Sequence, residues 1–420
     1  MKSRLQILLN DLINLHPKYI DLSLDRLKKL LYNLGNPHLD LPKTIHIAGT
    51  NGKGSIQSFI RSILVSNGYS CDAYISPHLT KFNERIVLNN RDVSTKKLYD
   101  TLKFVEKIND NNNITFFEIT TAVAFVLFQR SKSEFLVLET GLGGRLDATN
   151  IIPKKLFSII TPISYDHEEY LGSTIKKITI EKLGIIKNSK NIIISKQKDE
   201  VEKFIRKKLS GSKNLYFYGN NFRVSQLYKH KFEFKFSSKK KLVSKPKMNG
   251  LHQIENASVA LAFSELMKDQ NFDLSDKRID KAIKNTAWPG RLEMLNYKNK
   301  NIILDGSHNI DGAKKLNEFL RSKKIRPVVL FGMINNKKIF NFLKIISNRI
   351  SYLLALKIPN EKNAFTVNEI GKHCHKLSIN YIKIKNINEA LRHIRNSDQK
   401  YFLITGSLYL VGSIRKRFIN

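Results

Sequence analysis

The segment HIAGTNGKGS, at residues 46–55, decides the fold of this chain. The β-branched run TIHIA at residues 44–48 leads into it and predicts a strand, and the apolar spacing at residues 57–66 predicts a helix behind it. A strand, a glycine-rich turn and a helix in this order bring backbone N–H groups and the positive end of the helix to one point, which suits a phosphate. The segment therefore predicts a nucleotide-binding α/β domain.

The loop departs from the GxxxxGK[ST] pattern of phosphate-binding loops. Only two residues separate Gly49 from Gly52, and Gly54 stands between Lys53 and the hydroxyl of Ser55. We expect the glycines to let the backbone curl around a phosphate and Lys53 to reach the terminal phosphates. A glycine-rich turn without a ligand is the alternative, and the flanking strand, helix and lysine favour nucleotide binding.

The rest of the first half predicts a mainly parallel, doubly wound sheet. Apolar runs that predict strands lie at residues 135–138, 157–160 and 191–194, with helix-like segments between them. Alternating apolar and polar residues at 215–236 predict small antiparallel strands appended to that sheet.

A second series of strands and helices predicts a second, smaller α/β domain. Its five apolar runs lie at residues 301–304, 327–331, 352–355, 381–384 and 401–405. We place the domains at residues 1–295 and 296–420, with the seam in the polar stretch 291–300 that follows Trp288, Pro289 and Gly290.

Length and composition exclude several classes of protein. A chain of 420 residues with 41% hydrophobic residues exceeds a single core and is too apolar for a disordered protein. Cys71 and Cys374 lie far apart and outside any CxxC pair, which argues against disulfides and a cysteine zinc site. The longest uncharged apolar stretch, residues 402–414, is too short for a membrane helix. We expect a cytoplasmic monomer with no membrane partner.

The net charge of +36 invites a nucleic-acid interpretation. Residues 201–250 supply a third of it, with 12 Lys and 2 Arg against Glu202 and Glu233. Base recognition relies on arginine more than on lysine, and the sequence carries no recognisable helicase or RNA-binding module. We therefore interpret the excess as a solvated, lysine-rich face that attracts anionic substrates, and we expect no nucleic-acid partner.

Three more segments place polar residues where strands end. The strand in LVLETGLGGRLDATN, at residues 136–150, ends at Glu139, where open α/β sheets bind ligands and where Mg²⁺ finds the oxygen ligands it prefers. Residues 160–172 place Asp166 and His167 after another strand, and residues 301–312 place Asp305 and His308 after a strand of the second domain. A solvated strand end, a structural histidine and a polar turn are the alternatives.

Seven motifs occur in order along the chain: GTNGKGS at 49–55, YISPHL at 74–79, ETGLGGRLDATN at 139–150, DHEEYLG at 166–172, EKLGIIK at 181–187, WPGRLE at 288–293 and LDGSHN at 304–309. Together they resemble the folylpolyglutamate synthase and dihydrofolate synthase family, a branch of the Mur ligase superfamily of ATP-dependent amide-bond ligases. The match runs from Ile20 to GSLYLVG at 406–412 and so covers nearly the whole chain. SPHL and GLGGRLDATN are specific to the folate branch, whereas GTNGK marks only the superfamily.

The resemblance implies a P-loop-type ATPase domain and a smaller, Rossmann-like glutamate-ligase domain that close over ATP and a folate precursor. It assigns ATP to Gly49, Thr50, Asn51, Gly52, Lys53, Gly54, Ser55, Asn256, Arg291 and Asp305. It assigns magnesium, as two ions, to Ser76, Glu139 and His167. Lys182 matches a lysine that is carbamylated in the family, with an ordinary lysine as the alternative. The catalytic residues would be Lys53, Lys182 and His308, although a turn-stabilising hydrogen bond accounts equally well for His308.

The resemblance also implies a pterin site. It assigns this site to Tyr19, Ile20, Asp21, Leu22, Thr115, Phe116, Phe117, Asp147 and Ala148. An aromatic face such as Phe117 suits a flat heteroaromatic ring, and a carboxylate such as Asp147 suits its edge of donors. The phenylalanine pair fits a hydrophobic core equally well. These contacts favour a chain that accepts dihydropteroate and not only glutamylated folates.

The implied reaction joins L-glutamate to dihydropteroate, giving dihydrofolate, or to tetrahydrofolate polyglutamates. The folate carboxylate would attack the γ-phosphate of ATP, and the amine of glutamate would then displace phosphate from the acyl phosphate. A Mur-type ligase of cell-wall synthesis is one alternative, against which SPHL and GLGGRLDATN speak. A basic P-loop ATPase stimulated by nucleic acid is another, and steep salt dependence would mark it.

Overall fold

The first sheet is built around the strand that precedes the phosphate-type loop. This strand, β1 (Lys43–Ala48), pairs in parallel with β5 (Phe135–Glu139) and β6 (Lys155–Ile160) on its two sides. In the computed structural model, which describes residues 4–16 and 20–419, the sheet has the order β4-β3-β2-β5-β1-β6-β7-β8. Its other strands are β2 (Cys71–Tyr74), β3 (Ile86–Leu88), β4 (Arg91–Asp92), β7 (Ser189–Ile194) and β8 (Leu215–Phe217). The antiparallel β3 and β4 lie at one edge, and the rest is parallel, which confirms the predicted fold class.

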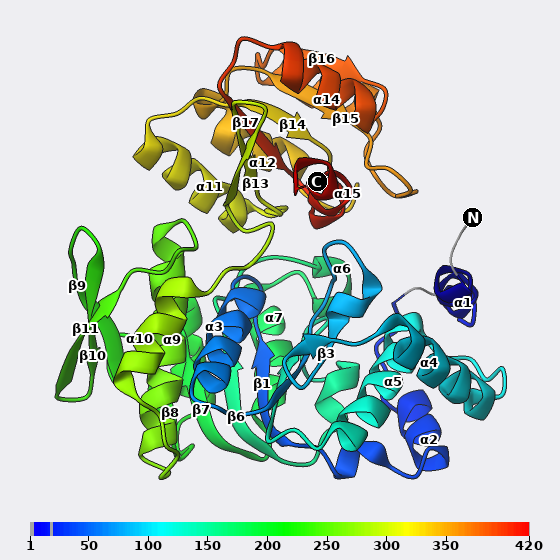
Figure 1. Ribbon diagram of the computed structural model, residues 1–420, viewed down its shortest axis with the longest axis vertical. Coiled ribbons are helices and arrows are strands. Elements are labelled where there is room, and N and C mark those ends of the chain that lie inside the picture. The colour runs from blue at the N-terminus through cyan, green and yellow to red at the C-terminus, as the bar shows by residue number, and fades with distance from the viewer. Residues whose placement is uncertain (1–3, 17–19, 420) are drawn as a thin grey trace. The chain divides into compact units, whose positions relative to one another are not determined.

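Helices cover both faces of this sheet (Figure 1). On one face, Phe157 of β6 packs edge-on against Phe263, with 4.9 Å between ring centroids. On the other face, Leu136 and Leu138 of β5 enter the hydrophobic cluster around Phe125. The helices of this unit are α1 (Arg4–Ile13), α2 (Asp25–Asn33), α3 (Lys53–Ser66), α4 (Thr95–Asn109), α5 (Phe116–Ser131), α6 (Glu168–Leu171), α7 (Ile175–Leu183), α8 (Asp199–Lys208), α9 (Leu251–Lys268) and α10 (Asp276–Asn285). Strands buried on both faces read as continuous apolar runs, which explains why the sequence reveals them.

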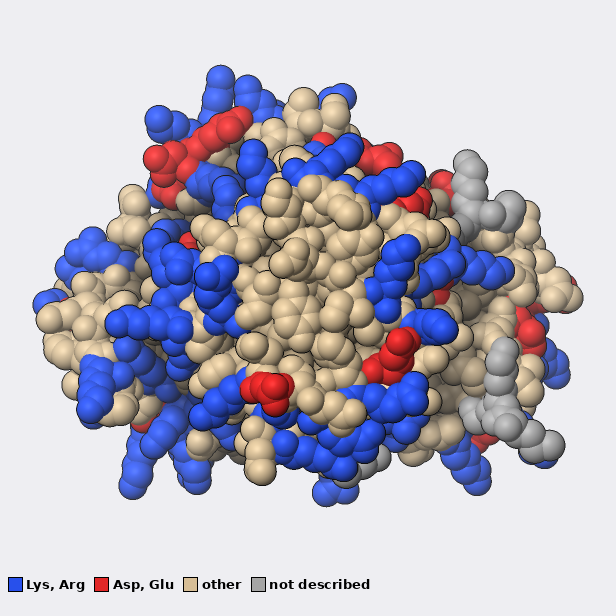
Figure 2. All heavy atoms as spheres, turned by 90° about the horizontal axis from the view of Figure 1, so that it is seen from above, with Lys and Arg blue, Asp and Glu red and all other residues tan. Residues whose placement is uncertain are grey.

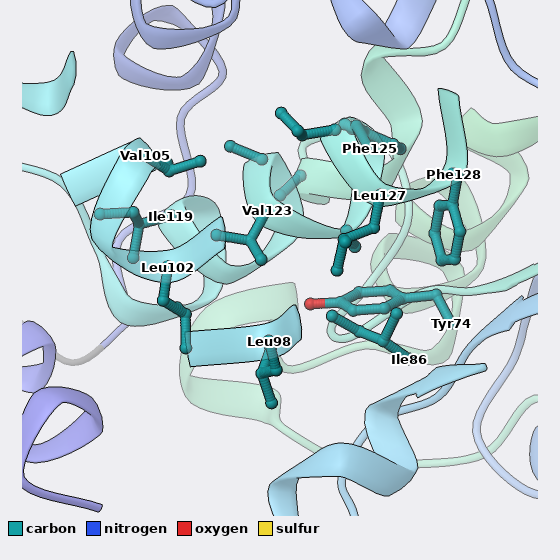
Figure 3. Packing of buried hydrophobic residues seen from close by; sticks show 14 of the residues in the cluster. Tyr74, Ile86, Leu98, Leu102, Val105, Ile119, Val123, Phe125, Leu127 and Phe128 are labelled. Atoms are coloured by element: carbon teal, nitrogen blue, oxygen red, sulfur yellow. The ribbon is translucent and has the colours of Figure 1, made fainter. Parts of the chain in front are cut away.

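Helix α5 forms the centre of the larger hydrophobic cluster. Its sequence FFEITTAVAFVLFQRS is apolar nearly all round, and most of its side chains are buried. Figure 3 shows Tyr74 of β2 lying beneath Leu127 and Phe128 of α5. The Tyr74 hydroxyl lies 3.2 Å from Oγ1 of Thr121, so this buried phenol keeps a hydrogen bond inside the cluster. The cluster thereby fixes the strand whose end carries the SPHL segment.

A small antiparallel sheet of β9 (Phe222–Leu227), β10 (Lys231–Phe236) and β11 (Lys239–Ser244) lies against α10, as expected for this part of the chain. Phe232, Phe234 and Phe236 alternate with more exposed residues along β10 and are buried. This is the period-two pattern of a sheet with one solvated face. The first of the expected strands, β8, instead joins the large sheet in parallel with β7.

The second unit contains a sheet of the order β12-β13-β17-β14-β15-β16 in the described residues. Its strands are β12 (Glu293–Tyr297), β13 (Lys300–Leu304), β14 (Val328–Phe331), β15 (Leu353–Leu356), β16 (Tyr381–Ile384) and β17 (Tyr401–Thr405). Its helices are α11 (Ile310–Lys323), α12 (Ile339–Ile346), α13 (Val367–Lys376), α14 (Ile387–Asn396) and α15 (Leu408–Ile419). All five predicted runs are strands. The polar stretch 291–300, expected as a connector, contributes β12, an antiparallel edge strand with no fully buried residue.

The chain divides into Met1–Lys245 with Glu255–Thr286, and Pro246–Ile254 with Ala287–Asn420. The division after Thr286 precedes β12, because that strand hydrogen-bonds to β13 of the second sheet. No helix within the described ranges is both long and apolar enough to cross a membrane. Figure 2 shows Lys and Arg side chains at many separate places on the visible face, around an area of uncharged residues.

Candidate active site

The phosphate-type loop and the three expected magnesium ligands lie at or after the carboxyl ends of four adjacent parallel strands. The phosphate-type loop follows β1, Glu139 ends β5, Ser76 follows β2, and His167 follows β6. The register places Ile47 beside Glu139 and Ala48 beside Ile160, so the strands end at nearly the same level. Sheet order therefore brings together segments that are more than a hundred residues apart in the sequence, at the edge where open α/β sheets bind ligands.

The glycine-rich loop leaves the first turn of α3 open. Gly52 precedes the helix in a left-handed conformation (φ +89°), and as a glycine it supplies no side-chain cap of its own. The Asn256 side chain borders this turn, because a Cβ on Gly52 would lie 2.9 Å from Oδ1 of Asn256. The backbone N–H groups of Lys53, Gly54 and Ser55 belong to the first turn of this helix, which is a favourable position for a phosphate.

Two residues of the loop have a structural role. The N–H groups of Thr50 and Asn51 both donate to the Pro162 carbonyl, over 3.0 and 3.2 Å. The Thr50 hydroxyl donates to the Ser164 carbonyl over 3.0 Å. These bonds tie the loop to the segment after β6. Because the N–H groups of Thr50 and Asn51 are already used in them, any contact of these two residues with ATP would involve other atoms.

Two lysines converge on one carbonyl of the loop. Lys182 Nζ donates to the Gly49 carbonyl over 2.9 Å, and Lys53 Nζ donates to the same oxygen over 3.3 Å. Lys53 Nζ also lies 3.9 Å from Oε1 of Glu139. The Lys53 ammonium thus lies beside the loop, where it can offset the charge of a phosphate.

Lys182 has the environment of a reactive amine. Its side chain on α7 is only 4% exposed. Burial, with the neighbouring charge of Lys53 as a second cause, lowers the pKa of Lys182 from 10.5 to about 7, against the opposing effects of Asp166 and Asp147. A large fraction of this lysine is therefore neutral near pH 7, as an amine nucleophile must be.

The three expected magnesium ligands offer a hydroxyl, a carboxylate and an imidazole. Ser76 Oγ is buried and has no hydrogen-bond partner among the described residues, as a ligand oxygen without its cation would. Glu139 is 4% exposed and forms an ion pair with Lys53. No cluster of three His, Cys, Asp or Glu side chains suited to a metal occurs in the described part of the chain, so a cation here would need the serine hydroxyl and phosphate oxygens. The oxygens of Ser76 and Glu139 are of the kind that a hard divalent cation prefers.

The expected pterin residues divide between two structural clusters, the first of which joins Asp21 to the start of α5. Arg26 Nη1 donates to Oδ2 of Asp21 over 2.9 Å, and its Nε donates to Oε2 of Glu118 over 3.2 Å. Glu118 in turn accepts from the backbone N–H of Thr115 over 2.8 Å, and the Thr115 hydroxyl caps the helix. Ile20 and Leu22, next to Asp21, are partly exposed, and Tyr19 lies outside the described residues.

The second cluster joins Phe117 to the loop after β5. A Cβ on Gly141 would lie 2.3 Å from Cζ of Phe117, so the ring lies directly on the backbone of that loop. Phe116 is 8% exposed and contacts the ring of Phe82 edge-on at 5.8 Å, which makes it a core residue. Of the phenylalanine pair, Phe117 is therefore the one available to a flat ring. Ala148 is buried in the same cluster as Phe116.

Asp147 holds the loop after β5 together. Its Oδ2 accepts from the Leu142 N–H over 2.6 Å, and its Oδ1 accepts from the N–H and the hydroxyl of Thr149 over 3.0 and 2.5 Å. The carboxyl is 2% exposed, and burial raises its pKa despite these hydrogen bonds. Whatever it binds, Asp147 has a fixed orientation.

Arg291, Asp305 and His308 lie in the second unit. Asp305 accepts from the N–H groups of Leu292 and Ser307 over 3.0 and 3.1 Å, and Arg291 is among the groups that oppose the raised pKa of this buried carboxyl. His308 Nδ1 lies 2.9 Å from the Gly306 carbonyl, the turn-stabilising contact considered as its alternative role. The contacts of these residues with ATP stay a prediction.

Sequence reasoning missed Arg26, Glu118, His46 and Thr149. Glu118 is separated from Thr115 by two residues in the T-x-x-E pattern of a capping box, so a local signal for it existed. The partners of Arg26 and His46 lie 92 and 103 residues away, and no local pattern pairs them.

We expect Gly49→Ala to weaken nucleotide binding about tenfold or more, because the loop has no room for a side chain and its φ of +151° disfavours one. A Cβ there would lie 1.9 Å from Oγ1 of Thr161 and 2.9 Å from its carbonyl oxygen. Calorimetric titration with ATP measures the change. Gly211→Ala is the matched control, since Gly211 also has a positive φ but no atom within 4 Å of the added Cβ. Unchanged affinity in Gly49→Ala would contradict the assignment of the loop.

Two family models match the chain. The Mur ligase middle domain matches residues 47–264, and the dihydrofolate synthetase C-terminal domain matches residues 290–417. Together they leave residues 1–46, 265–289 and 418–420 without a match.

Several relatives match over nearly their whole length. The chain is 32% identical over 416 residues to a dihydrofolate synthase/folylpolyglutamate synthase of Bacillus subtilis, covering 94% of each chain. It resembles the structure of E. coli FolC in complex with DHPP and ADP, with 26% identity, a TM-score of 0.88, and coverage of 99% and 97%. It also resembles a bifunctional folylpolyglutamate synthase/dihydrofolate synthase of Yersinia pestis complexed with AMPPNP and Mn, with 26% identity, a TM-score of 0.85, and coverage of 99% and 98%.

Proposed function

This chain belongs to the dihydrofolate synthase and folylpolyglutamate synthase family of Mur ligases, and from that membership we propose that it adds L-glutamate to dihydropteroate, and also to tetrahydrofolate polyglutamates, at the site on its first sheet. It is an ATP-dependent glutamate ligase of folate metabolism. ATP and a divalent cation are its cofactors, as the nucleotide and manganese complexes of relatives indicate.

The observation that carries the proposal is the convergence of Lys53 and Lys182 on the Gly49 carbonyl, beside the start of α3 and Glu139. A carboxylate is a poor electrophile, and its activation as an acyl phosphate requires a phosphoryl group to be held and its charge offset. The Lys53 ammonium, a helix N-terminus and a carboxylate suited to a metal supply these needs at one point.

In the proposed reaction, the folate carboxylate attacks the γ-phosphorus of ATP, the bond to the bridging oxygen breaks, and ADP leaves. The amine of L-glutamate then attacks the acyl carbon, loses a proton, and expels phosphate. Lys53 binds the phosphates and offsets their charge throughout. Ser76, Glu139 and His167 would hold the divalent cation, which when bound neutralises charge on the transferring phosphoryl group.

At the folate end, Phe117 offers its ring and Asp147 its carboxylate. Both are held by the Gly141–Leu142 turn. We propose that the pterin stacks on the ring of Phe117 and that its amino edge donates to Asp147.

Incubation of the protein with ATP, Mg²⁺, L-glutamate and either 7,8-dihydropteroate or tetrahydrofolate tests the proposal. We expect ADP release that depends on glutamate with both folates, and their relative rates will show which activity predominates. Glutamate-dependent turnover with a UDP-linked cell-wall precursor, and not with a folate, would show instead that the protein is a Mur ligase of cell-wall synthesis. No turnover on any of these substrates would refute the ligase assignment for this site.

We also propose that the enzyme acts as a cytoplasmic monomer. Its two free cysteines, Cys71 and Cys374, are buried. Burial raises the pKa of the Cys71 thiol to about 12 and that of Cys374 to about 11, so both are poor nucleophiles that suit a reducing compartment.

A further inference from the structure

His46 is a buried histidine that the proposed reaction does not use. It lies on β1, three residues before Gly49, and neither its side chain nor that of Thr149 is exposed to solvent. Such a polar pair inside a sheet is costly unless its hydrogen bonds are satisfied.

A chain of short hydrogen bonds runs from this histidine to Asp147. His46 Nε2 lies 2.8 Å from Oγ1 of Thr149, and that hydroxyl donates to Oδ1 of Asp147 over 2.5 Å. The other carboxylate oxygen accepts from the Leu142 N–H over 2.6 Å. The chain connects the strand before the phosphate-type loop with the loop after β5.

The number of protons available to these three side chains fixes which atom donates in each hydrogen bond. Two backbone N–H groups, of Leu142 and Thr149, point at the Asp147 carboxylate, which favours its ionised, accepting form. The single hydroxyl proton of Thr149 is then donated to Asp147, so His46 Nε2 must supply the proton in its own contact with Thr149. The other nitrogen, Nδ1, is buried without a hydrogen-bond partner among the described residues, which matches a neutral ring protonated on Nε2 alone.

The surroundings support a neutral ring. Burial, with the charge of Lys155 as a second cause, lowers the pKa of His46 well below 6.5. His46 therefore stays a fixed donor over the ordinary pH range and has no role as an acid or base.

We propose that His46 and Thr149 are positioning residues that orient the Asp147 carboxylate toward the pterin end of the folate substrate. The proposal rests on the proposed function of the site. Because the Thr149 hydroxyl links the two side chains, its loss disconnects His46 from Asp147 and leaves the carboxylate held by the N–H groups of Thr149 and Leu142. The Phe117 ring lies on the backbone of Gly141, and Asp147 accepts a hydrogen bond from the next residue, Leu142. The same short segment therefore holds both side chains.

Steady-state kinetics with Thr149→Val and Thr149→Ser tests this role. We expect Thr149→Val to raise KM for dihydropteroate about tenfold while KM for ATP and kcat change less than about twofold, because the lost bond orients only the folate end. Thr149→Ser keeps the hydroxyl and should restore the wild-type KM. Thr101→Val is the matched control, since Thr101 is also buried but donates only within α4, to the Lys97 carbonyl. Equal changes in all kinetic constants, or none, would overturn the proposal.

A measurement without turnover complements the kinetics. In ¹⁵N-labelled wild-type protein, NMR of the imidazole nitrogens, assigned by the loss of signals in His46→Gln, should show His46 protonated on Nε2 only. Protonation on Nδ1 alone would make Nε2 an acceptor, so the Thr149 hydroxyl would donate to His46 and not to Asp147, which would overturn the proposal. If Thr149→Val does not fold, His46→Phe, which removes the donor, and His46→Gln, which keeps one, replace it in the kinetic comparison with the same expectations. The NMR result is independent of activity, so a failure of the ligase assay in wild-type protein is distinguishable from a failure of this inference.

Discussion

Lys53→Ala should lower glutamate-dependent ADP release about 10³-fold or more and leave the fold intact. Lys53 Nζ lies between the Gly49 carbonyl, at 3.3 Å, and Glu139, at 3.9 Å, at the start of α3. Without the Lys53 ammonium, the negative charges of the ATP phosphates and of Glu139 repel each other with one cation fewer to offset them. This applies to bound ATP and to the transition state of phosphoryl transfer. The Lys53 side chain is 17% exposed and does not belong to a hydrophobic cluster, so its removal costs little packing.

The measurement combines the ADP-release assay with thermal unfolding of the same preparation. Lys176→Ala is the matched control, since Lys176 is an exposed lysine on α7 and lies outside the loop. A second readout follows from Lys182, whose pKa the charge of Lys53 helps to lower. In Lys53→Ala that pKa should rise toward 10.5, which titration by amine-reactive labelling detects. Activity close to wild type in Lys53→Ala would refute its phosphate role.

Local sequence was sufficient for the elements that carry strong periodic patterns. The strand, loop and helix around residues 46–55 were predictable because a buried parallel strand is apolar throughout and the glycines mark the turn. The five strands of the second sheet were predictable for the same reason. The edge strand β12 was not, because only one of its sides packs and its sequence is polar.

The site itself depended on long-range order. Glu139 was recognisable as a strand end, but Ser76 had no chemical signal of its own, and only the position of β2 beside β5 brings it to the same edge. Hydrogen bonds across 92 and 103 residues, from Arg26 and His46, have no signature in a single sequence. The sequence alone also could not distinguish the two adjacent phenylalanines. In the structure, Phe116 belongs to the hydrophobic core, whereas Phe117 lies against the Gly141 backbone.

Lys182→Ala should lower kcat about 10²-fold or more, with partial recovery on addition of acetate or bicarbonate. We propose that the neutral amine of Lys182 attacks CO₂ and releases a proton, forming a carbamate whose carboxylate helps to organise the cation at this site. A small carboxylate that diffuses into the space left by alanine replaces part of that charge. Lys182→Arg, which keeps a cation and forms no stable carbamate, should be inactive and should not respond to acetate.

The pH dependence of this reaction has a definite sign. Because burial lowers the pKa of Lys182 to about 7, the neutral amine predominates about tenfold at pH 8 and is outnumbered about tenfold at pH 6. Protein depleted of CO₂ should therefore regain activity with bicarbonate at pH 8 and much less at pH 6, whereas a lysine at 10.5 would react poorly at both. With ¹³C-labelled bicarbonate, NMR should show a carbamate carbon in wild type and in Lys176→Ala but not in Lys182→Ala. A carbamate signal that persists in Lys182→Ala, or full activity of that variant without acetate, would contradict the role of this amine.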